Sequence, residues 1–190
     1  MDLTVSHLST SFGDHPVLQD FSVRFPEGQI TCIRGPSGCG KTTLFNLLLG
    51  HIVPDAGEIA GMPERVSVVF QEDRLCEDFS ALSNLRFALG RKVPAEQLTA
   101  ALSELGLDGG DRRPVRTWSG GMKRRVALAR AVLFESDLLL LDEPFKGLDE
   151  ESRRQAAEFL LRRRAGRTVL CITHDDVDAR LLGAQEFHMA

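Results

Sequence analysis

The stretch Gly35-Pro36-Ser37-Gly38-Cys39-Gly40-Lys41-Thr42-Thr43 constrains the fold of this chain more than any other. It follows an apolar run, residues 30–33, that predicts a buried strand, and it precedes residues 44–49, which predict a helix closed by Gly50. A strand, a glycine loop ending in Gly-Lys-Thr and a helix form the P-loop pattern in the context that this motif requires. The alternative is a glycine-rich turn that binds nothing, which leaves the presence of both flanking elements unexplained.

The residue types in this P-loop suit the binding of a phosphate chain. Glycine lacks a Cβ, so backbone N–H groups can wrap an anion, and the following helix N-terminus adds partial positive charge. We expect Lys41 to reach the β- and γ-phosphates and the Thr42 hydroxyl to ligate Mg²⁺. The predicted nucleotide-binding residues of the loop are Gly35, Ser37, Gly38, Cys39, Gly40, Lys41, Thr42 and Thr43.

Length and composition are typical of one globular domain. The chain has 190 residues, 43% hydrophobic and 26% charged, with a net charge of −4 that gives no support for nucleic-acid binding. No apolar run approaches the roughly twenty residues of a membrane-spanning helix, and no secretory signal is visible. Any role at a membrane is therefore expected to depend on docking onto another chain. The cysteines lack C-x-x-C spacing and are predicted to be reduced thiols: Cys32, Cys39, Cys76 and Cys171.

Hydrophobic periodicity predicts an α/β fold over residues 1–190. Alternation indicates strands over 3–8 and 17–25, and apolar or β-branched runs indicate buried strands, including 66–70, 138–141 and 168–173. Helical spacing over residues 74–122 predicts a small helical subdomain, inserted between the core segments 1–73 and 123–190. A helix is predicted to open at Ser119-Gly120-Gly121, with Lys123, Arg124 and Arg125 on its solvated side.

Two adjacent acids, Asp142 and Glu143, follow the predicted strand 138–141. Ligands of open parallel sheets bind at the carboxyl ends of the strands. Asp142 would hold Mg²⁺, directly or through water, and Glu143 would polarise the attacking water of a phosphoryl transfer. An ordinary strand-to-turn transition is the alternative, but the P-loop in the same chain favours the functional interpretation.

The order of motifs resembles that of ABC-transporter ATPase subunits over nearly the whole chain. The order is P-loop, Gln71, Ser119-Gly120-Gly121, the Leu-rich strand with Asp142-Glu143, Leu148-Asp149, and His174. The resemblance implies a P-loop NTPase (RecA-like) core with an N-terminal antiparallel β subdomain and an inserted helical subdomain. It implies ATP and Mg²⁺ as cofactors. The implied catalytic residues are Glu143, His174, Gln71 and Lys41, and the implied metal ligands are Thr42, Gln71 and Asp142.

The resemblance also implies roles for single residues outside the P-loop. Phe12 resembles the aromatic residue that stacks on adenine, although a turn aromatic capping the core is the alternative. Gln71 resembles the glutamine that senses Mg²⁺ and the attacking water, and its alternative is a polar residue at a strand end. His174 resembles the switch histidine that contacts the γ-phosphate, whereas a lone strand-end histidine is usually structural. Asp149 resembles the aspartate that links two sites across a dimer.

Ser119-Gly120-Gly121 resembles the signature that contacts the γ-phosphate of a nucleotide held by the opposite subunit. A serine N-cap and bare glycine N–H groups make an anion site at a helix start, and a well-capped helix is the alternative. The usual sequence is Leu-Ser-Gly-Gly-Gln, and this chain departs from it at Trp118 and Met122. We expect the trans site to form because the serine and glycines remain.

The resemblance implies ATP-driven closure of a head-to-tail dimer that energises a membrane transporter. A homodimer is expected, and a heterodimer with a related subunit is the alternative. Residues 69–75 and 119–126 look like bacterial importers for nitrate, sulfonate and taurine. Implied partners are integral membrane subunits and a solute-binding protein, with the chain cytoplasmic and peripheral on the inner face of the membrane. The family receives a coupling helix near residues 71–89, which include Leu75, Phe79 and Leu85. We expect these apolar residues to belong to the subdomain core, with at most one or two of them exposed for docking.

Two alternatives belong to other classes. A soluble ABC ATPase acting on DNA or ribosomes usually has long coiled-coil insertions or two cassettes, and this chain has neither. A nucleotide-binding regulatory module that no longer hydrolyses is disfavoured because Glu143 and His174 are both present.

Overall fold

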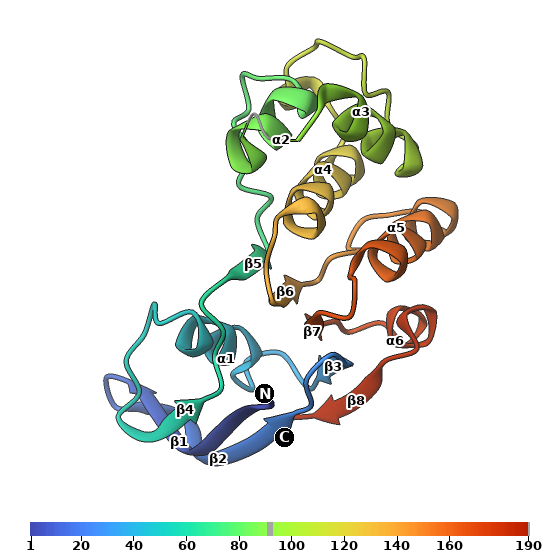
Figure 1. The fold of residues 1–190 in the computed structure, drawn as a ribbon. Coiled ribbons are helices and arrows are strands. Elements are labelled where there is room, and N and C mark those ends of the chain that lie inside the picture. Colours follow the sequence, from blue (N-terminus) through green and yellow to red (C-terminus); the bar gives the residue numbers. More distant parts are fainter. Residues whose placement is uncertain (91–92, 190) are drawn as a thin grey trace.

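The computed structural model describes residues 1–90 and 93–189, and it is layered (Figure 1). An antiparallel sheet of order β2-β1-β4 and helix α1 lie on one side of a parallel sheet of order β5-β6-β7-β3-β8. Helices α2 to α6 lie on the other side. This arrangement confirms the predicted P-loop NTPase architecture with its N-terminal antiparallel part.

The antiparallel sheet has β1 as its central strand. Strand β1 (Leu3–Phe12) pairs with β2 (His15–Phe25) on one side and with β4 (Ala56–Ala60) on the other. Alternate β1 side chains, such as Leu3 and Val5, are buried, as expected for a sheet with one covered face.

The parallel sheet brings the ends of separate chain segments to one edge. Its strands are β3 (Ile30–Arg34), β5 (Val66–Val69), β6 (Leu138–Asp142), β7 (Thr168–Ile172) and β8 (Gln185–His188). Ile172 lies opposite both Ile33 and Asp142 in the register, so β3, β6 and β7 end level with one another. Every residue of β6 is buried, as the continuous apolar run predicts.

The sheet separates two hydrophobic cores because successive side chains point to opposite faces. Leu139 and Leu141 belong to the core shared with the helices, while Leu138 and Leu140 face α1 and the antiparallel sheet. The cysteines are free, as predicted. A hydrogen bond with Cys32 and complete burial raise the pKa of Cys171, so this thiol stays protonated.

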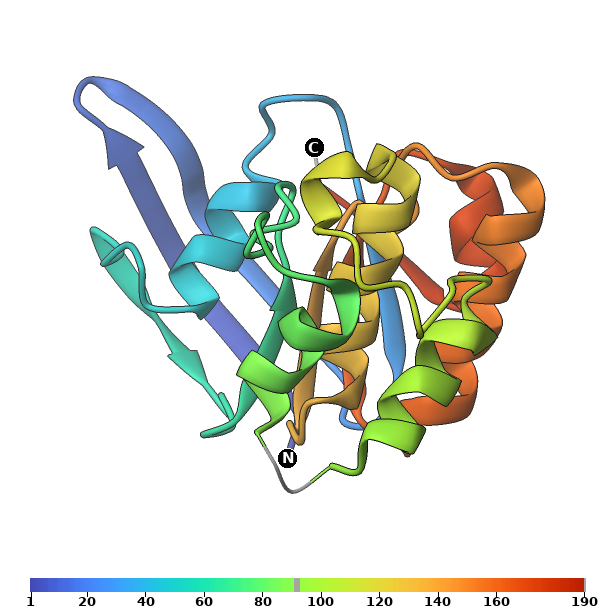
Figure 2. The same cartoon turned by 90° about the horizontal axis from the view of Figure 1, so that it is seen from above.

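The helices follow the predicted periodicity. Figures 1 and 2 show α2 and α3 beside α4, and Figure 1 places them at the end of the molecule far from β1, β2 and β4. Glu104 joins α3 to α5 through ion pairs with Arg162 and Arg163, and the hydrogen bond from Arg163 lowers the pKa of Glu104. The helices are α1 (Lys41–Leu48), α2 (Ala81–Leu89), α3 (Ala95–Glu104), the 3-10 helix η1 (Val115–Thr117), α4 (Gly120–Leu133), α5 (Glu150–Arg163) and α6 (Asp176–Leu182).

The prediction of a solvated basic side for α4 was wrong. The Arg124 side chain is buried, with 4% of its surface exposed, and Lys123 and Arg125 are half-buried. Helix α4 packs between the parallel sheet and α2 and α3, so Arg124 and Arg125 in its second turn donate to backbone carbonyls instead of facing water.

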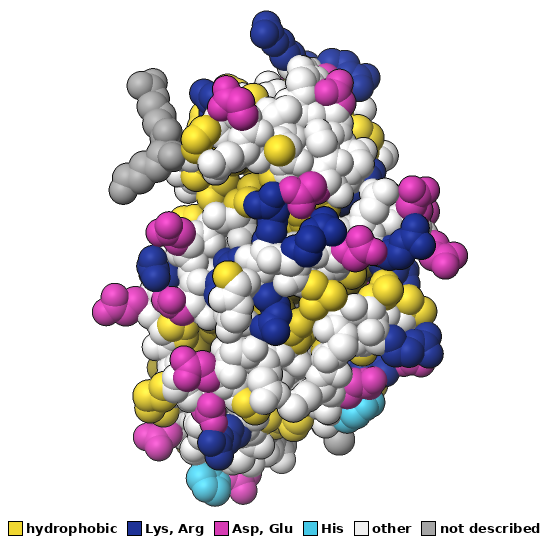
Figure 3. Space-filling model, turned by 45° about the vertical axis from the view of Figure 1, so that its right-hand side comes forward, with side chains coloured by type: hydrophobic (Ala, Val, Ile, Leu, Met, Phe, Trp, Pro, Cys, Tyr) yellow, Lys and Arg dark blue, Asp and Glu magenta, His cyan; other side chains and the backbone are white. Residues whose placement is uncertain are grey.

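The surface in Figure 3 carries Lys and Arg side chains interspersed with Asp and Glu. Among residues 1–90 and 93–189, no helix combines the length and the apolar character that crossing a bilayer requires.

Candidate functional site

The P-loop connects β3 to α1 through backbone conformations that require glycine. Gly38 and Gly40 have φ angles of 84° and 98°, in the region that other residues rarely adopt. A Cβ on Gly40 would lie 2.8 Å from the Leu18 side chain, so the loop also packs closely against β2. The backbone conformation and the close packing therefore both require glycine in this loop.

The start of α1 leaves its backbone donors available to an anion. Its N-cap, Gly40, makes no side-chain capping bond, and its first turn contains no acidic side chain. The Lys41 side chain is 6% exposed, and its Nζ donates to the carbonyl oxygens of Gly35 at 2.9 Å and Pro36 at 2.8 Å. A buried ammonium beside free helix N–H groups favours the binding of phosphate.

Asp142 lies at the end of β6 with 7% of its surface exposed. Burial is the main cause that raises the pKa of Asp142, and the neighbouring charge of Glu143 raises it further. The Thr42 hydroxyl donates to Asp142 Oδ2 at 3.4 Å, so two of the three predicted metal ligands are adjacent. A divalent cation at this point would offset the cost of the buried carboxylate.

Mg²⁺ fits these ligands only together with oxygens from outside the protein. Within residues 1–90 and 93–189, His, Cys, Asp and Glu side chains form no group of three that could hold a metal. Magnesium is usually bound by one or two protein oxygens plus water and substrate phosphates. The carboxylate of Asp142 and the hydroxyl of Thr42 match that pattern.

Glu143 extends into the same region from an unusual backbone conformation. Its φ is +49°, and its N–H donates to Ile172 O at 2.9 Å. One carboxylate oxygen lies 2.7 Å from Lys146 Nζ and the other lies 3.4 Å from His174 Nε2. The structure thus brings Glu143 and His174 together and adds Lys146, which sequence analysis did not single out.

One cavity of about 410 Å³ gathers most of the predicted nucleotide-site residues at the carboxyl edge of the sheet. Phe12 does not line it and lies at the end of β1, with 52% of its surface exposed. Gly35 and Cys39 are part of the loop but are not among the lining residues. Those residues are Ser37, Gly38, Gly40, Lys41, Thr42, Thr43, Gln71, Asp142, Glu143, Lys146, Ile172 and His174.

A second cavity, of about 480 Å³, contains the predicted signature residues Ser119, Gly120 and Gly121 together with Asp149. Ser119 caps α4 by accepting a hydrogen bond from the Met122 N–H at 3.3 Å. Gln71 and Lys146 line both cavities. Within one chain, the predicted residues therefore divide into two neighbouring sites.

The signature segment is held closely against the segment that precedes α5. A Cβ on Gly121 would lie 3.2 Å from the Gly147 carbonyl oxygen, which favours glycine at this position. Asp149 caps α5, and the hydrogen bond from the Ser152 N–H is the main cause that lowers the pKa of Asp149. Trp118, where the signature departs from leucine, is 6% exposed and packs in the helical core.

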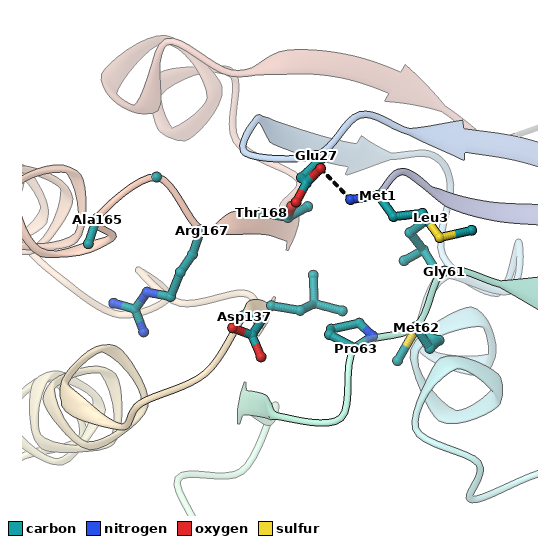
Figure 4. A pocket seen from close by; sticks show the side chains of 12 residues that line it. Met1, Leu3, Glu27, Gly61, Met62, Pro63, Asp137, Ala165, Arg167 and Thr168 are labelled. Carbon is teal, nitrogen blue, oxygen red and sulfur yellow. Dashed lines mark ion pairs between the residues drawn. The ribbon is translucent and has the colours of Figure 1, made fainter.

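Another cavity of about 410 Å³ lies at the opposite edge of the sheet (Figure 4). Leu138 and Thr168, the first residues of β6 and β7, line it, and the amino group of Met1 pairs there with Glu27. It contains none of the predicted site residues. The cavity at the P-loop is instead at the edge where ligands of parallel sheets bind.

Comparison with known proteins matches residues 18–146 to the family model described as "ABC transporter". The taurine import ATP-binding protein TauB of Yersinia pestis bv. Antiqua (strain Antiqua) is 40% identical, covering 96% of this chain and 77% of that protein. The aliphatic sulfonates import ATP-binding protein SsuB 1 of Paracoccus denitrificans (strain Pd 1222) is 40% identical, with 95% and 76% covered. The taurine import ATP-binding protein TauB of Escherichia coli O157:H7 is 36% identical, with 96% and 77% covered.

The fold and the P-loop, taken with these similarities, define an ATP-binding ATPase domain. The chain belongs to the ABC transporter family. The resemblance seen in the sequence is confirmed, including its likeness to sulfonate and taurine importers.

Proposed function

We propose that this chain hydrolyses ATP to drive the import of a small solute through membrane subunits. The observation that carries the proposal is one cavity in which the P-loop meets Asp142, Glu143 and His174. The import ATP-binding proteins for taurine and aliphatic sulfonates are similar over most of the chain. By that similarity, a small organic sulfonate is the proposed solute class.

The residues of the cavity divide the work of hydrolysis. The P-loop N–H groups and Lys41 bind the phosphate chain, and Thr42, Asp142 and Gln71 would hold Mg²⁺. Mg²⁺ held there would supply positive charge that stabilises the negative charge of the transferred phosphoryl group. Glu143 accepts a proton as the water oxygen bonds to the γ-phosphorus, and the bond to ADP breaks.

Two copies would complete each site. In one chain the P-loop and Ser119 line different cavities. A nucleotide bound at the P-loop is therefore not enclosed by Ser119 of the same chain. In the proposed head-to-tail homodimer, Ser119 and Gly121 of one copy close onto the nucleotide held by the P-loop of the other. Asp149, Gln71 and Lys146, which line the Ser119 cavity, would then lie near both nucleotides.

An exposed aromatic pair marks the proposed contact with the membrane subunits. Phe79 and Phe87 are 50% and 59% exposed and pack edge to face, with ring centroids 5.0 Å apart. Leu85 is fully buried and Leu75 packs against the core, so neither is free to dock. Exposed apolar side chains in contact with one another favour a protein partner. The chain would thereby be held at the inner face of the membrane, in a transporter that includes a solute-binding protein.

Glu143→Gln tests the proposed hydrolysis and dimer closure together. We expect about 10²- to 10⁴-fold slower hydrolysis, because the general base is lost, while ATP binding persists and a dimer accumulates with Mg²⁺ and ATP. Size-exclusion chromatography and phosphate release provide the measurements. Glu135→Gln is a matched control because the Glu135 side chain is 92% exposed and pairs only with Arg65 among the described residues. Wild-type hydrolysis by the Glu143 variant would refute the assignment.

Co-purification tests the proposed partners. The chain is purified with the products of adjacent reading frames, and a multi-span membrane protein is expected with it. Phe79→Asp is expected to reduce that recovery without changing ATP binding by the free chain. Equal recovery of the membrane protein with Phe79→Asp would show that the aromatic pair is not part of the interface.

A further inference from the structure

We propose that Arg124 is a positioning residue for hydrolysis, because its guanidinium holds the Glu143 peptide so that the carboxylate enters the nucleotide cavity. The inference rests on the function proposed above for Glu143. Arg124 is the middle residue of the basic run 123–125, and nothing in that run distinguishes it from its neighbours.

The Arg124 guanidinium is buried against the end of β6. Its Nε donates to Glu143 O at 3.1 Å, and its Nη2 donates to the same oxygen at 2.8 Å. Nη2 also donates to the Asp142 carbonyl oxygen. Two parallel bonds to one carbonyl fix the orientation of the peptide that follows Glu143 more firmly than a single bond does.

This peptide needs to be held because Glu143 adopts a conformation that side-chain-bearing residues rarely adopt. Its φ is +49°, and such conformations persist where surrounding contacts enforce them. The N–H of Glu143 is bonded to Ile172 O on β7, and its carbonyl is bonded to Arg124. With both backbone groups held, the carboxylate lies between Lys146 and His174 in the nucleotide cavity.

The same guanidinium reaches the segment that carries Gln71. Arg124 Nη1 donates to Phe70 O at 2.6 Å, to Gln71 O at 3.5 Å and to Asp73 Oδ1 at 3.0 Å. The Asp73 carboxylate therefore orients the guanidinium from the side opposite Glu143. Arg124 lies in the second turn of α4, whose N-cap is Ser119, so its guanidinium connects this helix directly to the Glu143 peptide.

Arg130 provides a control on the same helix. It donates to Asp73 O at 2.9 Å and to Arg74 O at 2.6 Å, so it also anchors the segment after β5. Its hydrogen bonds within the described residues do not include Asp142 or Glu143. If losing an arginine from α4 had only a structural effect, substitutions of Arg124 and of Arg130 should therefore lower the activity alike.

The first experiment compares Arg124→Lys with Arg130→Lys in the full chain, using Mg²⁺-ATP hydrolysis and binding of a fluorescent ATP analogue. Lysine keeps the charge but cannot span Glu143, Phe70 and Asp73. We expect kcat of Arg124→Lys to fall about 10- to 100-fold, because a misplaced group loses the productive geometry. KM and analogue affinity should change by less than about 2-fold, because ground-state binding is retained. Arg130→Lys should keep the wild-type kcat.

The second experiment places Arg124→Lys in the Glu143→Gln background. A residue that acts through Glu143 should cause no further loss of rate there, because the effects of coupled groups are not additive. A further 10-fold loss, or an equal fall of kcat in Arg124→Lys and Arg130→Lys, would overturn the inference. Parallel loss of kcat and analogue binding would overturn it as well.

Asp73→Asn keeps the test decisive if Arg124→Lys does not fold. It retains the bonds from Arg124 to Glu143 and weakens only the contact that orients Nη1, so we expect a few-fold lower kcat with unchanged binding. An unchanged kcat would overturn the inference. Wild-type hydrolysis by Glu143→Gln would overturn both the proposed function and this inference, whereas a wild-type kcat in Arg124→Lys beside an inactive Glu143→Gln would overturn this inference alone.

Discussion

The buried carboxylate of Asp142 should make the protein less stable than a neutral residue would. Asp142 is 7% exposed, and burial followed by the charge of Glu143 raises its pKa above the ordinary 3.8. The hydrogen bond from the Thr42 hydroxyl and the positive charge of Arg124 lower the pKa of Asp142. We therefore expect Asp142→Asn to stabilise the protein in the absence of nucleotide and to abolish the dependence of ATP binding on Mg²⁺.

The sign of this effect follows from proton linkage. A raised folded-state pKa means that the native protein binds the Asp142 proton more tightly than the unfolded chain does, so ionisation above both pKa values lowers the stability. An ionised buried group costs several kcal/mol, and Thr42, Arg124 and Lys146 offset part of that cost here. We expect a net gain on the order of 1 kcal/mol for Asp142→Asn at pH 7, or about 2–4 °C in Tm for a chain of this size.

Thermal unfolding at pH 7 and pH 5 measures the effect. The gain should shrink as the pH falls toward the raised pKa, because the native Asp142 then becomes protonated. Asp149→Ala is the opposite case, because the hydrogen bond from the Ser152 N–H lowers the pKa of Asp149. Removing this N-cap carboxylate should therefore lower Tm. A lower Tm for Asp142→Asn at pH 7 would refute the electrostatic reasoning, and unchanged Mg²⁺ dependence of ATP binding would refute the metal assignment.

Two further substitutions test the P-loop and the joint between α4 and α5. Lys41→Ala should lose most affinity for a fluorescent ATP analogue, and unchanged binding would contradict the P-loop assignment. Arg167 donates to Val132 O at 2.8 Å near the end of α4 and to Arg163 O at 2.7 Å at the end of α5. Arg167→Met should therefore reduce the free energy of unfolding by about 2–4 kcal/mol; an unchanged midpoint in denaturant would show that these bonds contribute little.

Much of the site was predictable because each part is encoded locally. The P-loop is contiguous, and its glycines, Lys41 and Thr42 carry their chemistry in their spacing. Gln71, Asp142 and His174 each follow a buried apolar run. Since parallel strands end at a common edge, such residues are expected to meet, and they line one cavity. Ser119 was likewise predictable, because serine is a preferred N-cap residue and it caps α4 in the structure.

The contacts around Glu143 were not predictable in the same way. Lys146 pairs with Glu143, yet a lysine in a connecting segment has no pattern that indicates its partner. The positive φ of Glu143 is also invisible in the sequence, because only glycine signals such a conformation through its identity.

The sequence by itself determined the class of fold, the P-loop and the strand ends that carry the proposed site residues, because periodicity and spacing are local properties. Only the tertiary structure decided which of the adjacent Lys123, Arg124 and Arg125 is buried. The physical reason is that a guanidinium is buried only where acceptors replace water. Those acceptors reach Arg124 from 54 residues away at Phe70 and 19 residues away at Glu143, through packing that no local pattern records.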